Sequence, residues 1–333
     1  MFLVLTMCIL YGRKVKKSYR RCAELMDELQ DIWIGRVDSE TDQSQFRYHQ
    51  VVRFHEQGEN DIGLIGFSSD EGVRRNNGRL GAKEGPNVIR KLLASLPWHF
   101  SNGIFDFGNI YCVDQVLEDA QIKLGKAVSQ VLNNNHKLIV LGGGHETTYG
   151  HYLGVREAIG SEKKLGIINI DAHFDMRPYD IEPTSGTMFK QILDDDPNAS
   201  YFVMGIQQFG NTVSLFEEAK QKNVQYILEE HLNQTSMEDL TIKLQQFIDR
   251  HDAVYLTLCM DVLNVSYAPG VSATNAFGLD PFKVREIIRT VLACDKTTSF
   301  DICEVNPAYD IDNRTAKLAA AFVNEAIHMF TTR

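Results

Sequence analysis

Short apolar runs alternate with amphipathic stretches along most of this chain, and that alternation limits the fold more than any other feature of the sequence. Six runs rich in aliphatic and β-branched residues are typical of buried strands, namely Ile62–Phe67, Leu138–Leu141, Leu165–Ile170, Tyr201–Met204, Val254–Leu258 and Ser299–Val305. Six other stretches have helical spacing, namely Pro86–Ser95, Gln115–Asn133, Leu215–Lys222, Met237–Asp249, Pro281–Ala293 and Thr315–Phe330. This alternation predicts a three-layer α/β/α domain, in which helices cover both faces of a mostly parallel sheet.

A single domain accounts for the length and composition of the chain. It has 333 residues, of which 44% are apolar, and this is enough for one complete hydrophobic core. No internal repeat and no Pro- or Ser-rich linker divides it, so we expect one main domain over residues 51–333. Residues 1–50 are expected to form an irregular or helical extension, because positions 14–29 carry Leu, Met, Lys and Glu at helical spacing.

The net charge argues against several classes of partner. A formal charge of −10 and a pI near 5.5 oppose binding to nucleic acids and anionic membranes, since the summed field repels polyanions. The apolar residues 1–10 are too few for a bilayer span, which needs ~20 residues. Six scattered cysteines without a CxxC pair favour a reducing compartment, the cytoplasm. A small molecule is therefore the expected partner.

Polar segments follow two of the expected strands directly. The run KLIVL ends in three glycines, which let backbone or ligand approach closely, and His145 comes next. By itself, a histidine after glycines is more often a packing or turn residue than a ligand. The run LGIINI ends in Asp171, His173 and Asp175, and extended residues at i, i+2 and i+4 point the same way. Mixed carboxylate and imidazole ligation suits Mn²⁺, so we favour a metal site over a polar loop that caps a helix.

Two further strand ends carry similar residues. Cys259 and Asp261 follow the run VYLTL at i, i+2 spacing, and the last strand delivers Asp301, Glu304 and Asn306. In an open parallel sheet, ligands bind outside the carboxyl ends of the strands, where the connecting loops converge. The four strand ends together therefore predict a divalent metal centre.

The segments GGGHE, DAHFD, TLCMD and EVNP, in this order, resemble the arginase and agmatinase superfamily of manganese ureohydrolases. The resemblance covers roughly Asp61 to the end of the chain. Within the superfamily, the segments GFSSDEGVRRNNGRLGAKEGP, PTSGTMF, GIQQFGNT and APGVSATNAFGL look most like the formimidoylglutamase branch. The resemblance implies an arginase-like fold and manganese-dependent hydrolysis of N-formimidoyl-L-glutamate to L-glutamate and formamide, a step of histidine degradation. It also implies a homo-oligomer, because superfamily members often form trimers or hexamers.

The resemblance assigns roles to individual residues. It implies that one manganese ion is bound by His145, Asp171, Asp175 and Cys259, and a second by Asp171, His173, Cys259 and Asp261. It further implies that Glu304 hydrogen-bonds the nitrogen groups of the substrate. Two divalent ions ~3.5–4 Å apart can generate hydroxide near neutral pH, and Asp175 is our candidate to carry a proton to the departing amine.

Two positions depart from the arginase pattern. Arginases have a histidine proton shuttle where this chain has Phe189, and formimidoylglutamases also tend to lack that histidine. Cys259 stands where the superfamily has a bridging Asp, and a thiolate prefers zinc or iron to manganese. The sequence therefore leaves the occupancy of the second metal site open, and the alternative is a buried cysteine that only fills space.

A substrate with two carboxylates needs cationic groups, and arginine binds carboxylates bidentately. The predicted substrate-binding residues are Arg177, Arg74, Arg75, Asn77, Arg79 and Ser185. Two alternatives stay open. The chain could be another ureohydrolase, acting on agmatine or a guanidino acid, or a metal-poor homologue that binds a dicarboxylate without turnover, as Cys259 suggests.

Overall fold

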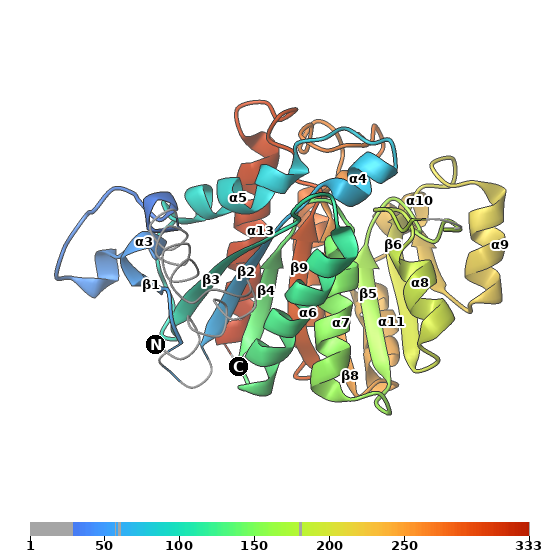
Figure 1. Cartoon of the computed structure of the whole chain (residues 1–333), viewed down its shortest axis with the longest axis horizontal. Coiled ribbons are helices and arrows are strands. Elements are labelled where there is room, and N and C mark those ends of the chain that lie inside the picture. The colour runs from blue at the N-terminus through green and yellow to red at the C-terminus, as the bar shows by residue number, and fades with distance from the viewer. Residues whose placement is uncertain (1–28, 57, 59–60, 180–181, 333) are drawn as a thin grey trace.

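A nine-stranded sheet forms the middle layer of the part of the chain that the computed structural model describes, residues 29–56, 58, 61–179 and 182–332 (Figure 1). All its strand pairs are parallel, and the order is β1-β3-β2-β4-β9-β8-β5-β6-β7. The strands are β1 Val52–Arg53, β2 Ile62–Ser68, β3 Ile104–Tyr111, β4 Lys137–Leu141, β5 Leu165–Ile170, β6 Ala199–Ile206, β7 Gln225–Leu228, β8 Ala253–Cys259 and β9 Thr297–Cys303.

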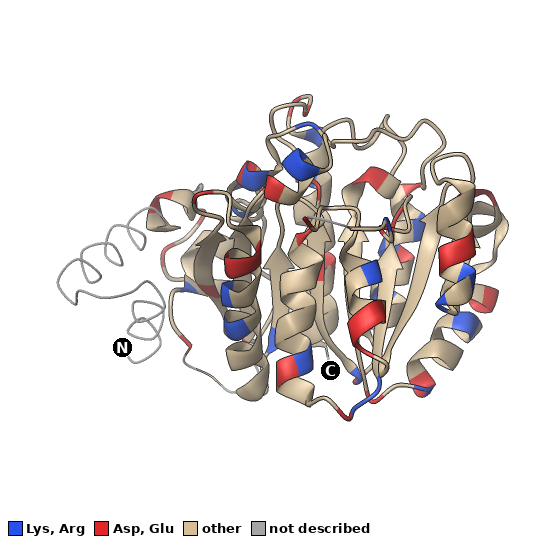
Figure 2. Cartoon of the chain, turned by 45° about the vertical axis from the view of Figure 1, so that its right-hand side comes forward, with Lys and Arg blue, Asp and Glu red and all other residues tan. Residues whose placement is uncertain are grey.

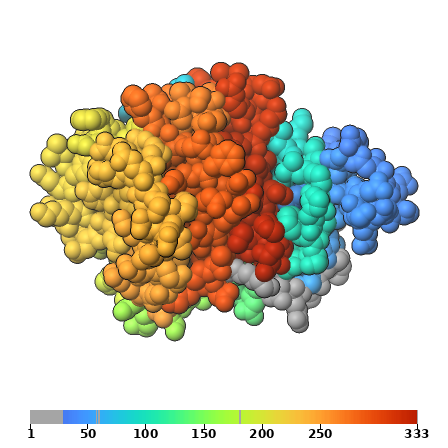
Figure 3. All heavy atoms as spheres, turned by 180° about the vertical axis from the view of Figure 1, so that it is seen from behind, coloured from blue at the N-terminus to red at the C-terminus, as the bar shows by residue number. Residues whose placement is uncertain are grey.

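Helices cover both faces of the sheet. The layer in front in Figure 1 contains α6 Leu117–Asn133, α7 Thr147–Ile159 and α8 Met188–Asp195. The layer behind it, which dominates the surface in Figure 3, contains α5 Gly85–Leu93, α11 Met237–Asp249, α12 Pro281–Leu292 and α13 Arg314–Thr331. Shorter helices at the edges and loops are α3 Tyr48–Val51, α4 Glu71–Arg75, α9 Val213–Gln221 and α10 Glu229–Gln234. Three short 3-10 helices are η1 Gln43–Gln45, η2 Ala82–Glu84 and η3 Met260–Val262.

Each face of the sheet has its own hydrophobic core. In β4, Leu138 and Val140 pack with the front helices, whereas Ile139 and Leu141 pack with the helices behind. Strands buried on both faces read as continuous apolar runs, which is why they could be recognised in the sequence. The predicted three-layer fold is confirmed, and the sheet is more uniformly parallel than expected.

The predicted strands and helices all occur, with small differences at their ends. One strand, expected over Ser299–Val305, ends earlier, at Cys303, because Glu304 has a φ of 68° and an extended strand cannot continue through it. The sequence analysis did not assign β1, β3, β7 or the helices α7 and α8.

The strand order places four polar strand ends side by side. β4 is followed along the chain by β5, but β9 and β8 lie between them in the sheet. The order therefore reverses around β4, β9, β8 and β5, and such switch points are where open α/β sheets bind ligands. All four strands that carry the predicted site residues are neighbours at this point.

The described part of the N-terminal region packs against the sheet. Trp33 is buried and its Nε1 donates a hydrogen bond to Asp106 Oδ2 at 2.8 Å. Tyr48 is also buried, and its backbone N–H donates to the Leu96 carbonyl at 3.1 Å. Most of the helix predicted over residues 14–29 lies outside the described residues. No described helix is long and apolar enough to cross a bilayer.

The buried ion pair between Arg90 and Asp106 joins α5 to β3, and its loss should be costly. Arg90 Nε and Nη2 lie 2.7 and 2.8 Å from the two Asp106 oxygens, and both side chains are fully buried. We predict that Asp106→Asn lowers the free energy of unfolding by about 3–5 kcal/mol, because it leaves the Arg90 guanidinium without a counter-charge. Urea denaturation measures the change.

The matched control is Asp312→Asn, which breaks an exposed ion pair with Lys317. This change should cost less than about 1 kcal/mol. Equal stability of the two variants would show that the Arg90 pair does not support the fold.

Candidate active site

The carboxyl edge of the four central strands gathers the polar segments predicted from the sequence. The register pairs Ile170 with Leu258 and Cys259 with Cys303, so Asp171 leaves β5 beside Cys259 of β8. Figure 2 shows Asp and Glu residues among the loops at this edge of the sheet. Residues that are far apart in the chain thus lie in one buried place.

The first group of side chains surrounds His145. Its Nδ1 lies 2.9 Å from Asp175 Oδ2 and 3.0 Å from Asp171 Oδ2. The Cys259 thiol belongs to the same cluster, in which the possible ligand atoms of His145, Asp171 and Cys259 lie within 4.8 Å of one another. This group contains every residue that the resemblance assigned to the first metal ion.

The second group shares Asp171 with the first. His173 Nδ1 lies 3.3 Å from Asp261 Oδ2 and 3.6 Å from Asp171 Oδ1. Asp261 Oδ1 is buried and has no hydrogen-bond partner among the described residues. A buried carboxylate oxygen without a donor is costly, and a cation would satisfy it. The donor set, three carboxylates with two imidazoles, fits divalent ions such as Mn²⁺.

Burial and neighbouring charges shift the pKa values of the side chains in this cluster in opposite directions. Burial alone would raise the pKa of Asp171, but hydrogen bonds from His145 and His173 outweigh it and hold that pKa below its usual value. Burial, together with repulsion from Asp171, raises the pKa of Asp175. Burial and the surrounding carboxylates raise the pKa of the Cys259 thiol as well. Bound cations would offset the repulsion among the buried carboxylates of this cluster. They would also favour the thiolate form of Cys259.

Glu304 faces the same site from the end of β9. Its Oε1 accepts a hydrogen bond from the His145 backbone N–H at 2.9 Å, and its own N–H donates to the Gly143 carbonyl at 2.8 Å. These bonds hold it at a φ of 68°, which is rare for a residue other than glycine. Burial raises the Glu304 pKa to about 8, and Oε2 is buried without a partner among the described residues. A ligand that carries N–H groups would complete this hydrogen bonding.

A layer of buried polar residues supports His145 from below. His145 Nε2 lies 3.0 Å from Thr257 Oγ1, which donates to Asp301 Oδ1 at 2.6 Å. Asp301 Oδ2 in turn lies 2.5 Å from His151 Nδ1. The structure places Asp301, predicted only as a residue of a polar strand end, beneath His145, where it forms a cluster with His145 and Cys303. Sequence reasoning missed Thr257 and His151, although a Thr inside an apolar strand was a visible signal.

A second supporting contact fixes Asp171. Asn169, inside β5, donates from Nδ2 to Asp171 Oδ2 at 3.1 Å, and the same group donates to the Tyr201 hydroxyl at 2.9 Å. Phe189 stacks on the Tyr201 ring with centroids 4.0 Å apart and lies edge-on to His145 at 5.9 Å. Phe189, which stands where arginases have a histidine proton shuttle, therefore forms part of an apolar wall beside the site.

The loop after β2 lies over the glycines that follow β4, and Glu146 joins the two. Glu146 is fully buried, and its Oε1 accepts from Ser69 Oγ and from the Gly72 N–H, both at 3.0 Å. Burial raises the Glu146 pKa to about 7. This residue, which the sequence analysis did not single out, holds the arginine-rich loop at the edge of the site.

Most arginines of that loop already bond to the protein. Arg75 is buried and pairs with Glu71 at 3.0 Å and with Glu118 at 2.6 Å, while Arg74 binds both oxygens of Glu71. Arg79 donates to the carbonyls of Val271 and Ser272 and stacks on the Tyr309 ring at 4.3 Å. Asn77 has a left-handed backbone, with a φ of 57°.

Arg177 differs from these arginines, because most of its guanidinium is not bonded to the protein. Its Nη1 donates to Asn76 Oδ1 at 2.6 Å, and the other two nitrogens of its guanidinium have no hydrogen bond to any described residue. Its backbone N–H donates to the Gly186 carbonyl at 2.9 Å. Asn76 Nδ2 also donates to the hydroxyl of the buried Ser185 at 3.4 Å. Asn76, which the sequence analysis did not name, thus places Arg177 beside Ser185.

The chain is similar to known proteins over most of its length. The sequence profile of the arginase family matches residues 60–329. A formimidoylglutamase of Geobacillus sp. (strain WCH70) is 52% identical over 309 residues, covering 90% of this chain and 95% of the relative. A formimidoylglutamase of Staphylococcus carnosus (strain TM300) is 41% identical over 304 residues, covering 90% and 98%.

Two solved structures share the fold. Formimidoylglutamase from Bacillus subtilis superposes with a TM-score of 0.78 at 22% identity, covering 88% of this chain and 94% of that one. Formiminoglutamase from Trypanosoma cruzi with Mn²⁺ superposes with a TM-score of 0.77 at 25% identity, covering 87% and 99%. The arginase-like architecture predicted from the sequence is thereby confirmed.

Manganese should stabilise this chain through Asp171, which both groups of side chains share. We predict that Mn²⁺ at a hundred times its dissociation constant stabilises the folded state by about 2.7 kcal/mol for each ion bound. Asp171→Asn should abolish the stabilisation, because the remaining side chains no longer form either group. Thermal unfolding with and without Mn²⁺ measures the effect, and the exposed variant Asp239→Asn is the control. An unchanged response in Asp171→Asn would place the ion elsewhere.

Proposed function

Since this chain belongs to the arginase family, we propose that it hydrolyses N-formimidoyl-L-glutamate to L-glutamate and formamide in a manganese-dependent reaction. The observation that carries the proposal is the convergence of six predicted metal ligands and Glu304 at one edge of the sheet. Two curated formimidoylglutamases are each 52% identical over 90% of the chain, which supports this substrate. Assembly into a homo-oligomer and a cytoplasmic location stay predictions.

We propose two manganese ions per chain. His145, Asp171, Asp175 and Cys259 would hold one ion, and Asp171, His173, Cys259 and Asp261 the other. The fit of oxygen and imidazole donors to manganese supports this, as does the unpartnered Asp261 oxygen. When bound, such ions supply Lewis acidity, which brings the pKa of water into the neutral range.

Glu304 and Asp175 have different tasks in the proposed reaction. Glu304 Oε2 accepts an N–H of the amidine, and this holds the formimidoyl carbon in a fixed orientation. Asp175 Oδ2 lies 2.9 Å from His145 Nδ1, on the side where both residues would hold the first ion, so its other oxygen is the one that carries a proton to the departing amine. Phe189 and Tyr201 exclude water from one side of the site.

Arg177 is the proposed anchor for the two carboxylates of the glutamate part. Its guanidinium is exposed and keeps donors that no described residue uses, whereas all the donor nitrogens of Arg75 bond within the protein. Arg74, Asn77, Arg79 and Ser185 line the same loops and complete the proposed binding site. Agmatine has no carboxylate, so this arrangement favours the dicarboxylate substrate.

A comparison of substrates tests the proposed function. We expect kcat/KM for N-formimidoyl-L-glutamate to exceed that for arginine, agmatine and guanidinobutyrate by at least about a hundredfold, because only the first substrate brings two carboxylates to Arg177 and the loops beside it. Steady-state kinetics of the manganese-loaded protein measures this. Comparable turnover of agmatine would assign the chain to another ureohydrolase, and no turnover of any substrate would favour a non-catalytic homologue.

The role of Asp175 has its own variant. Asp175→Asn should lower kcat by about 10²–10⁴-fold, since an amide cannot carry the proton. Asn tolerates the left-handed φ of 49° at this position, so the fold should survive. Asp312→Asn, at a φ of 53° on the surface, is the matched control. Retained turnover in Asp175→Asn would remove the residue from proton transfer.

Cys259 decides how many ions the chain holds. Cys259→Asp should keep two manganese ions per chain and preserve or raise activity, because a carboxylate is a harder ligand than a thiolate. Cys259→Ala should lower the manganese content of the loaded protein. Metal analysis by mass spectrometry measures both. Two retained ions and full activity in Cys259→Ala would mean that the cysteine only fills space.

A further inference from the structure

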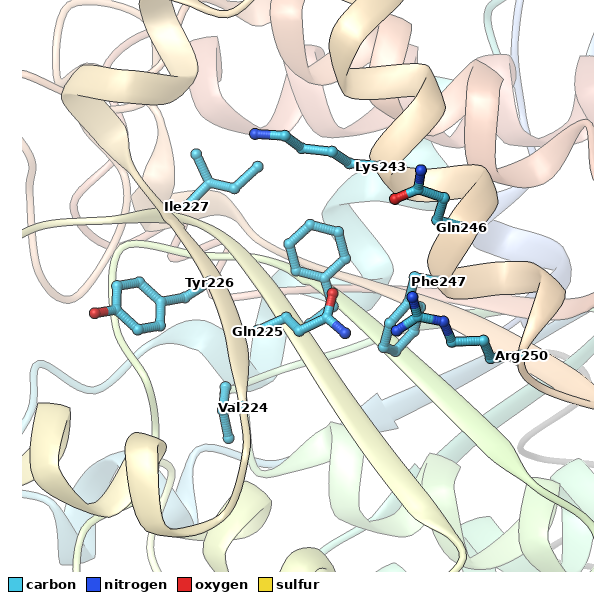
Figure 4. Close-up of a pocket in the computed structure, with 9 residues that line it drawn as sticks. Val224, Gln225, Tyr226, Ile227, Lys243, Gln246, Phe247 and Arg250 are labelled. Atoms are coloured by element: carbon cyan, nitrogen blue, oxygen red, sulfur yellow. The ribbon is translucent and has the colours of Figure 1, made fainter.

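A hollow lies at the amino ends of the strands, opposite the carboxyl ends that form the active site. It has a volume of about 390 Å³ and lies between β7 and α11 (Figure 4), and Phe202 of β6 also lines it. A smaller hollow of about 270 Å³ shares Gln225, Phe247 and Arg250 with it. Gln225 is the first residue of β7 and Arg250 directly follows α11, so both hollows belong to the amino ends of the strands. We call the two together the amino-edge pocket.

Two cations face this pocket without a counter-charge. Lys243 of α11 and Arg250, which caps the end of that helix with helical backbone angles, are seven residues apart and so lie on the same side of the helix, ~10 Å apart along its axis. Neither side chain has a hydrogen bond or ion pair with a described residue, and no Asp or Glu of the described chain lines either hollow. In Figure 4 the two cations lie at different ends of the larger hollow, with the amide of Gln225 between them.

Further positive charge gathers where the two hollows meet. Lys164 lines the smaller hollow together with Arg250. His251 lines it too, but burial and the charges of Lys164, Lys296 and Arg250 lower the pKa of His251, so its neutral form is favoured and the positive charge comes from the lysine and the arginine. In a chain with a net charge of −10, this is a local excess of cations that would attract an anion.

Phe202 and Phe247 line the larger hollow, and only 3% and 2% of their surfaces are exposed. The rings of Phe202 and Phe247 have centroids 5.5 Å apart, and those of Phe247 and His251 4.4 Å apart. Ile227 is buried beside them. An apolar floor with a few polar groups at its rim is the usual composition of a small-molecule pocket, and the larger hollow falls in the usual size range of about 300–1,000 Å³.

We propose that the amino-edge pocket binds a small organic anion with a planar apolar body, at a site separate from the hydrolytic centre. An acidic group, carboxylate or phosphate, pairs with Arg250, and a second acidic or polar group at the other end of the molecule reaches Lys243. The apolar body fills the hollow between the two cations, where it touches the small exposed part of Phe247. Gln225 donates or accepts hydrogen bonds along the edge of this body. Cations alone would hold any anion, and the apolar side chains that line the hollow favour one with an apolar body.

Displacement of a fluorescent probe tests this proposal on the full-length, manganese-loaded protein. The probe is 8-anilinonaphthalene-1-sulfonate, which joins an anionic group to aromatic rings. Terephthalate and phenyl phosphate should displace it from the pocket, whereas benzyl alcohol and inorganic phosphate should each be at least tenfold weaker. Displacement by benzyl alcohol as strong as that by terephthalate would overturn the role of charge. Displacement by inorganic phosphate as strong as that by phenyl phosphate would overturn the role of the apolar floor.

Charge-neutral variants locate the binding. The double variant Lys243→Gln with Arg250→Gln should weaken terephthalate at least tenfold, and Arg250→Lys should give an intermediate affinity. Lys91→Gln, at an exposed lysine of α5, is the matched control and should bind as the unaltered protein does. Thermal unfolding and hydrolysis should be unchanged in all variants, since none touches the active site. Unchanged affinity in the double variant, or binding that does not saturate, would overturn the proposal.

Discussion

The Asp171 carboxylate joins the two halves of the candidate active site, and much of the surrounding structure serves to hold it. It lies between His145 and His173 at the end of β5, where the neighbouring strand β8 supplies Cys259 and the short helix η3 after it supplies Asp261. Asn169 fixes one of its oxygens from within the same strand. Such a concentration of buried negative charge is stable only with compensating positive charge, and this is the physical reason why the site suits divalent cations.

The sequence predicted the fold and the cluster of ligands because both depend on local patterns. Continuous apolar runs mark strands that are buried on both faces, and side chains at i and i+2 after such a run reach the same edge of the sheet. For Asp171, His173 and Asp175 this reasoning needed only five consecutive residues. The pairing of those residues with His145 and Asp261 needed the family resemblance, since strand order cannot be read from spacing.

The remaining features could not be predicted from the sequence, because they depend on residues far away in the chain. The helix α7 contains Gly150 and Gly154, which lower helical propensity but let α7 approach α6 closely at Gly125. Arg75 looked available for substrate, and only the structure shows it buried between Glu71 and Glu118. Thr257 and His151 support His145 through Asp301, a contact between different elements. Burial and long-range pairing decide such roles, and neither is local.

The strand order also governs when the hydrolytic centre can form during synthesis. β4 and β5 leave the ribosome early, yet the two strands that separate them in the sheet, β8 and β9, are made about a hundred residues later. A nascent chain that ends before residue 253 lacks both β8 and β9. The strands on the β4 side of the sheet and those on the β5 side then have no strands between them with which to pair. Parallel pairing over such long separations is slow to form, and exposed apolar edges persist meanwhile. Nascent chains of this protein are therefore expected to depend on chaperones until β8 and β9, in the last quarter of the sequence, have emerged.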